Sequence, residues 1–132
     1  MYRPFLTAGA FLGGLGVALG AFGAHGLQKI TQDETVLHGF QTAVQYQIYH
    51  ALALLAVALI HDRLPHRYIR WAGSCFITGI ILFSGSLYLL TFLKIRESGI
   101  INVVGPVTPL GGVFFIAGWL LLWIGAMGKK SS

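Results

Sequence analysis

The sequence contains very few charged residues. Only 10% of its 132 residues are Asp, Glu, Lys or Arg, whereas soluble domains contain about 25%. So few charges could hardly cover a surface that faces water, and 55% of the residues are hydrophobic. The formal net charge of +5 comes from basic residues between apolar runs, which form no patch rich enough to bind nucleic acid. The composition therefore favours a membrane protein and argues against a nucleic-acid partner.

Cysteine pairs and intramembrane carboxylates are also missing. Cys75 is the single cysteine, which excludes an internal disulfide, a CxxC pair and a thiol oxidoreductase site. No Asp or Glu occurs in the long apolar runs, although a small proton-coupled drug exporter normally needs a buried carboxylate. The HExxH motif of metalloproteases is absent. No nucleophile, base and orienting residue can be assembled from the spacing, so we expect no enzymatic activity.

Four long apolar runs are present instead. Each has roughly 20 residues, enough to cross a hydrocarbon core of about 30 Å, and lipid cannot satisfy any backbone that is not helical. The predicted spans cover about residues 5–24, 40–60, 71–93 and 107–127. We therefore predict one domain over residues 1–132, an all-α bundle of four transmembrane helices. The connection over residues 26–39 contains apolar residues among polar ones and is predicted to hold a short interfacial helix.

The basic residues predict the orientation of the bundle. With four spans, both termini and the connection over residues 61–70 lie on the same side of the membrane. That side carries six Lys and Arg residues and the opposite side carries three. They are Arg3, Arg63, Arg67, Arg70, Lys129 and Lys130 against Lys29, Lys94 and Arg96. Because positive residues prefer the cytoplasmic side, both termini are predicted to be cytoplasmic.

Glycines form a seam along two of the spans. The two seams are Gly9, Gly13, Gly16, Gly20 and Gly23, and Gly111, Gly118 and Gly125. Their spacing of three, four or seven residues places each set on one helix face. Such a face lets another helix backbone approach closely. The seams therefore indicate either packing inside the bundle or a homo-oligomer; membrane lipids are the other expected partner.

Polar side chains gather in the half of the bundle that lies opposite the termini. The candidate ligand-binding residues are His25, Gln45, Tyr46, Tyr49, His50, Ser84, Ser86, Tyr88 and Thr108. His50 lies near the bilayer midplane, and an ionisable group at that depth is a functional candidate. Gln47 points away from Gln45 and needs a partner of its own or an aqueous setting. Two roles stay open: hydrogen bonding between helices, or a ligand or proton site that opens toward the outer face.

Histidines could also bind a metal-containing cofactor. His25 and His50 come from the first and second spans, and two histidines suit the axial ligation of a b-type haem in principle. Their different apparent depths make this the minor alternative. We expect no cofactor and no metal site.

Four motifs together resemble a known family. They are "ALGAFGAHGL", "FQTAVQYQIYHALALL", "LFSGSLYLL" and "GPVTPLGGVFFIAGWLLL", one from each span. In combination they resemble the signature of the domain-of-unknown-function 423 family of small bacterial membrane proteins, which has a eukaryotic transmembrane relative. The resemblance implies a four-span protein of the bacterial plasma (inner) membrane and supplies no activity, cofactor or catalytic residue.

The expected function follows from these observations. We expect a small, non-enzymatic membrane protein with a structural or accessory role in a membrane complex. The alternative is a binder, or a transporter or channel component, that recognises a small molecule or lipid through the polar cluster.

Overall fold

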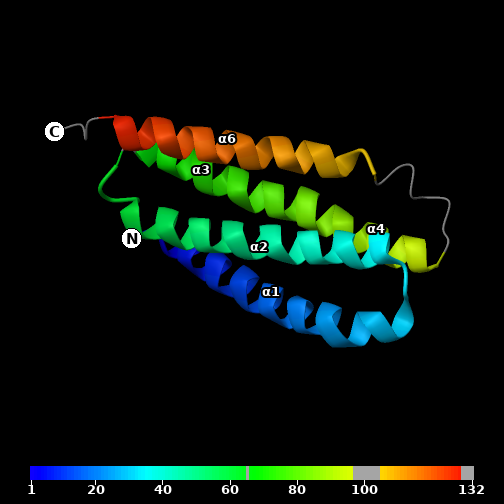
Figure 1. Ribbon diagram of the computed structural model, residues 1–132. Helices are drawn as coiled ribbons and strands as arrows, with labels where there is room; N and C mark the ends of the chain where they lie inside the picture. Colours follow the sequence, from blue (N-terminus) through cyan, green and yellow to red (C-terminus); the bar gives the residue numbers. More distant parts are fainter. Residues whose placement is uncertain (65, 97–104, 129–132) are drawn as a thin grey trace.

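The computed structural model describes residues 1–64, 66–96 and 105–128, and every regular element in them is helical (Figure 1). The elements are α1 (Arg3–Ile30), α2 (Glu34–Ile60), α3 (His66–Gly79), the π-helix η1 (Ile80–Ser84), α4 (Gly85–Ile95) and α6 (Val107–Met127). The elements α3, η1 and α4 follow one another directly and form one long segment. With this segment counted once, four helices of the described residues are long and apolar enough to cross a membrane. The predicted all-α bundle of four spans is confirmed.

The first two helices extend well beyond the predicted spans. Helix α1 ends at Ile30, and α2 begins at Glu34 after Asp33, whose carboxylate accepts a hydrogen bond from the backbone N–H of Thr35 (2.9 Å). The prediction of a long connection with its own interfacial helix was therefore wrong. Leu27 and Phe40 belong to one buried apolar cluster, so burial of their side chains keeps both segments helical up to a three-residue connection.

The four spans pack in chain order (Figure 1). Helix α1 packs on α2, α2 packs on α3 and α4, and α6 packs on α3 and η1. The N-terminus and the end of α6 lie at the same end of the bundle, which we call the terminal end (Figure 1). There the backbone N–H of Tyr2 donates to the carbonyl oxygen of Ala58 (2.9 Å). We call the opposite end the far end; the polar cluster was predicted to lie in its half of the bundle.

Apolar clusters hold both ends together. The terminal-end cluster consists of Phe5, Ala53, Leu54, Val57, Ala58, Ile69 and Phe76, and thus joins α1, α2 and α3. The far-end cluster consists of Leu27, Phe40 and Val44, with Tyr88 and Ile95 of α4 packed against it. Along α2, the buried polar side chains of Gln47 and His50 lie between these two clusters.

Both glycine seams face helices of the same chain. Atoms of α2 or of α3–η1 lie where a Cβ atom would project from most of these glycines. The pairs are Gly9 with Leu55, Gly16 with Ile48, Gly23 with Phe40, Gly111 with Phe83, Gly118 with Phe76 and Gly125 with Ile69. An oligomer formed through these seams would have to displace a helix of its own chain. A homo-oligomer stays a prediction, and it would need a different surface.

A close backbone approach joins α6 to the π-helix. In η1 the N–H of Gly85 donates to the carbonyl of Ile80, five residues back, which widens the turn. A Cβ atom on Gly111 would lie 2.7 Å from the Cα atom of Phe83. Because the obstructing atoms belong to the backbone, they cannot move aside as a side chain can. Glycine is therefore required at position 111.

We predict that Gly111→Ala lowers the free energy of unfolding by about 1–3 kcal/mol, the usual cost of overpacking. Gly112→Ala is the matched control, because the nearest atom to its added Cβ lies 3.9 Å away on the Phe83 ring. The control should match or slightly exceed wild-type stability, since alanine favours helix. Unfolding in mixed detergent micelles measures both values. Equal stability of the two variants would contradict the observed approach.

Candidate functional site

Gln47 of α2 joins three helices through one amide. Its side chain is 2% exposed. The amide Nε2 donates to the carbonyl oxygen of Leu12 in α1 (2.8 Å), and Oε1 accepts from the Tyr88 hydroxyl in α4 (2.6 Å). Both ends of the amide thus have partners within the protein.

The glycine seam makes the Leu12 carbonyl accessible. In an α-helix this oxygen accepts from the N–H of residue 16, and a side chain at that position would cover it. Residue 16 is glycine, and a Cβ there would lie 3.5 Å from the Gln47 Nε2 atom and 2.8 Å from Ile48. A carbonyl oxygen has two lone pairs and can accept a second hydrogen bond. Gly16 therefore gives Gln47 a backbone acceptor inside the bundle.

His50 lies between α2 and α6, where both of its ring nitrogens are hydrogen-bonded. Nδ1 lies 2.7 Å from the backbone oxygen of Tyr46, and Nε2 lies 3.0 Å from the indole Nε1 of Trp119. The ring stacks on Phe115, with centroids 3.7 Å apart at 12°. Indole N–H groups only donate and carbonyls only accept. The geometry therefore requires a neutral imidazole with its proton on Nδ1.

Three hydroxyl groups complete the buried polar cluster. Ser84 at the end of η1 donates to the backbone oxygen of Ala43 in α2 (2.8 Å). The Ser86 hydroxyl lies 2.9 Å from the backbone oxygen of Phe83 and 2.5 Å from the Thr108 hydroxyl of α6. Ser84 thus contacts α2 while Ser86 contacts α6, so the two serines join different neighbours of the third span.

The structure brings together five of the nine predicted site residues. His50, Ser84, Ser86, Tyr88 and Thr108 take part in hydrogen bonds between helices. The other four, His25, Gln45, Tyr46 and Tyr49, lie at the surface. Tyr46 is 38% exposed, and its ring stacks on Phe83 at 4.7 Å. Gln45 lines a pocket between α1 and α2, and His25 lies on the exposed surface of α1.

Two central residues were missing from the predicted site. The sequence did indicate a role for Gln47. Because its side chain points away from that of Gln45 on the helix, it needed a hydrogen-bond partner of its own or an aqueous setting. Trp119 carried no sequence signal of a site residue, since a tryptophan in a span is typical of lipid contact or packing. Its role depends on a contact with His50 that no local periodicity reveals.

The described residues offer little for metal binding. Residues 1–64, 66–96 and 105–128 contain no group of three His, Cys, Asp or Glu side chains that could hold a metal ion. Ligation of haem by His50 would require the loss of the Trp119 or the Tyr46 hydrogen bond. His25, the other ligand considered, lies on the exposed surface of α1.

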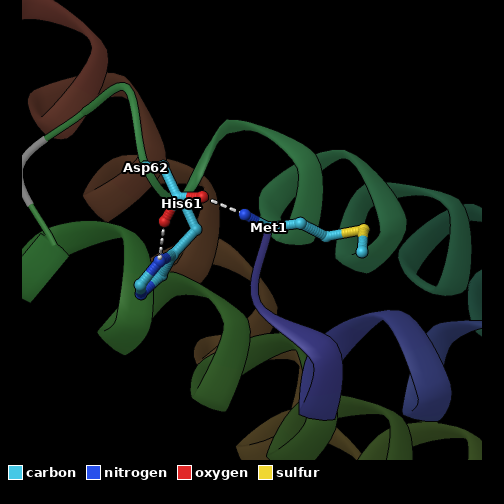
Figure 2. Close-up of polar contacts among 3 residues, drawn as sticks. All are labelled: Met1, His61 and Asp62. Carbon is cyan, nitrogen blue, oxygen red and sulfur yellow. Dashed lines mark hydrogen bonds and ion pairs between the residues drawn. The ribbon is translucent and has the colours of Figure 1, made fainter.

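A second polar cluster lies at the terminal end (Figure 2). The N-terminal ammonium group of Met1 forms an ion pair with Asp62, and the other carboxylate oxygen of Asp62 lies 3.3 Å from Nδ1 of His61. The His61 ring packs against Tyr2, with centroids 4.7 Å apart. Hydrogen bonding to the ammonium group, followed by that to His61, lowers the pKa of Asp62. The cluster fastens the start of α1 to the connection after α2.

Comparison with known proteins identifies the family. A family model with the description "Protein of unknown function (DUF423)" matches residues 19–112. The chain belongs to the DUF423 family. The resemblance seen in the four motifs is confirmed.

Relatives of this DUF423 protein extend from bacteria to yeast. The UPF0382 membrane protein YwdK of Bacillus subtilis (strain 168) is 43% identical over 126 residues, which cover 95% of this chain and 97% of the relative. A UPF0382 membrane protein of Haemophilus influenzae is 42% identical over 131 residues and 99% of each chain. The UPF0382 membrane protein C1782.12c of Schizosaccharomyces pombe is 41% identical over 115 residues, 87% of this chain and 94% of the relative. No solved structure matches.

The relatives and the fold together give the location. The bacterial relatives are named membrane proteins, and this DUF423 chain has four helices in its described residues that can cross a membrane. The predicted location, a multi-pass protein of the bacterial inner membrane, is confirmed.

We predict that Gln47→Leu destabilises the DUF423 protein by about 1–2 kcal/mol, because hydrogen bonds inside membranes contribute about 0.6–2 kcal/mol each. Combining it with Tyr88→Phe should cost less than the sum of the single changes, since both remove the same bond. Unfolding in mixed micelles measures this coupling, and strict additivity would contradict it. Gln45→Leu is the control, because Gln45 is exposed and should be neutral.

We predict a small acid-sensitive contribution from Asp62. Its pKa is lower in the folded state than its ordinary value of 3.8, so its stabilisation is fully present above that pH and is lost as the pH falls through the folded-state pKa. Asp62→Asn should therefore lower the unfolding temperature slightly at about pH 6, and this difference should shrink as the pH is lowered below 3.8. The effect is small because the pair is exposed to solvent. A difference that is constant across this range would contradict the assignment.

Proposed function

We propose that this protein is a non-enzymatic integral membrane protein with a structural or accessory role in a membrane complex. The observation that supports this role is that the buried polar side chains in the middle of the bundle are hydrogen-bonded to side chains and backbone carbonyls of neighbouring helices. Gln47 and His50, the two buried polar side chains of α2, each have partners at both ends. Because the bonds cross between helices, they hold the helices in register.

The hydroxyl groups support a non-catalytic role for the same reason. A nucleophilic serine needs a neighbouring base that accepts its proton. Ser84 donates to a backbone carbonyl and Ser86 pairs with Thr108 and a backbone carbonyl, while the Nε2 atom of His50 faces Trp119. These contacts stabilise the bundle and leave the serines without an activating base.

The outward face of α1 supports participation in a complex. Ala10, Gly14 and Ala18 are exposed and follow one another at intervals of four residues, a spacing that lets transmembrane helices pack closely. A Cβ atom on Gly14 would have no other atom within 4 Å. This face is separate from the glycine seam that contacts α2, so a second copy of the chain or another membrane protein can pack on it.

The proposed orientation places the terminal end in the cytoplasm. The larger share of Lys and Arg at that end supports it. A reporter enzyme that is active only outside the cytoplasm, fused after Ser132, tests the orientation; activity of the reporter would contradict it.

The alternative function is a binder, or a transporter or channel component, for a small molecule or lipid. At the buried part of the cluster, a ligand would have to compete with the hydrogen bonds of Gln47 and His50. Gln45 is the predicted site residue that lies at a pocket, and this pocket is the observation that favours the alternative.

We predict that a photo-crosslinking amino acid at position 14 gives one discrete protein adduct in living cells. The adduct has twice the mass of the chain if the partner is a second copy, and another fixed mass if the partner is a different protein. The same amino acid at position 113 serves as the control, because Val113 is exposed on the outer face of α6 and is expected to contact lipid. Gel analysis of the tagged chain measures both.

Two results would overturn the proposal. If neither position gives a protein adduct, the chain is alone in the membrane and has no accessory role. If the purified protein retains a stoichiometric chromophore or small molecule that His50→Ala releases without unfolding the protein, the buried cluster is a ligand site. An absorption spectrum and native mass spectrometry distinguish these results.

A further inference from the structure

A pocket of about 330 Å³ lies between the far-end halves of α1 and α2. Small residues of α1 and larger apolar residues of α2 line it. They are Gly20, Gly23 and Ala24 from α1 and Leu37, Phe40 and Val44 from α2. Its volume is in the range of small-molecule sites, about 300–1,000 Å³.

Three amides complete the lining of this pocket. Gln28 comes from α1, and Gln41 and Gln45 come from α2, one helical turn apart. All three are exposed on the surface of the chain, so the pocket opens to the outside of the bundle. Among the described residues, no protein group is hydrogen-bonded to their side-chain amides, in contrast to Gln47.

The depth of the pocket places two of these amides in hydrocarbon. At 1.5 Å per residue α2 is about 40 Å long, and Gln41 and Gln45 lie about 10 Å and about 16 Å from its first residue. A hydrocarbon core of about 30 Å, centred on the helix, begins about 5 Å from that residue. An amide at such depth is costly unless it finds a hydrogen-bond partner. The partner has to come from outside the chain.

We propose that this pocket binds one glycerophospholipid from the leaflet at the far end. The amide N–H groups of Gln41 and Gln45 donate to its ester oxygens, which lie next to the hydrocarbon and can only accept. Its acyl chain lies along Phe40 and Val44 and over the glycines of α1. The site is separate from the buried cluster and does not depend on the proposed structural role.

The shape and position of the pocket favour a lipid over a partner helix. A helix is about 10 Å across and cannot enter a pocket of about 330 Å³, whereas a single acyl chain of a lipid can. The opening faces the lipid-exposed surface within the span, which a water-soluble molecule reaches only through the bilayer. A phospholipid is present there already and carries both oxygen acceptors and an apolar chain.

The test uses the full chain in nanodiscs of phosphatidylethanolamine and phosphatidylglycerol that contain a trace of the same lipids with a photoactivatable acyl chain. Peptide mapping should find the lipid adducts concentrated on residues 20–45. Ala24→Phe fills the pocket from α1, where Ala24 is exposed, and should lower these adducts about tenfold, which corresponds to about 1.4 kcal/mol of binding. Ala56→Phe is the matched control, because Ala56 of α2 is also exposed but lies outside the pocket and outside the small-residue face of α1.

A second pair of variants tests the amides. Gln41→Leu with Gln45→Leu keeps the volume and makes the surface more apolar, so the protein stays folded while lipid retention in native mass spectra falls about tenfold. Adducts spread evenly over the outer faces of all helices, or equal adducts in Ala24→Phe and Ala56→Phe, would overturn the proposal. Crosslinking at position 14 reports on a different face, so either proposal can fail without the other.

Discussion

One amide fixes the relative positions of the first three spans. Gln47 reaches α1 with its nitrogen and α4 with its oxygen, and hydrocarbon offers no substitute for either partner. His50, three residues later on α2, connects α6 through the Trp119 indole. Because hydrogen bonds depend steeply on distance and angle, these two side chains specify the height of each helix against α2.

The hydrogen bonds and the glycines together hold the helices in contact. Without a hydrophobic driving force between helices in lipid, association depends on close packing and on buried polar contacts. Gly16 contributes to both. Its missing side chain leaves room for Ile48 of α2, and it leaves the Leu12 carbonyl accessible to the Gln47 amide. On the other side, Gly111 lets α6 reach the widened turn of η1. Residues without side chains thus decide where backbone atoms meet.

The sequence predicts the spans well because their composition reflects the solvent around them. The fourth span, residues 107–127, coincides with α6. The ends of α1 and α2 were missed, since burial of Leu27 and Val36 decides them and charge content does not reveal burial. The π-helix and the Trp119–His50 bond were missed because both depend on contacts between α6 and earlier spans. Of the nine residues in the predicted polar cluster, five form hydrogen bonds between helices and four lie at the surface of the chain, and their role as a ligand site stays a prediction.

The three-residue connection at residues 31–33 makes α1 and α2 a helical hairpin. Such a segment extends about 10 Å at most, so neither helix can cross the bilayer while the other stays behind. As formed helices, α1 and α2 therefore cross the membrane as one unit. In this paired form Gln47 already faces the Leu12 carbonyl, and the polar half of α2 enters the lipid with part of its hydrogen bonding satisfied. The short connection therefore serves insertion as much as it serves the finished fold.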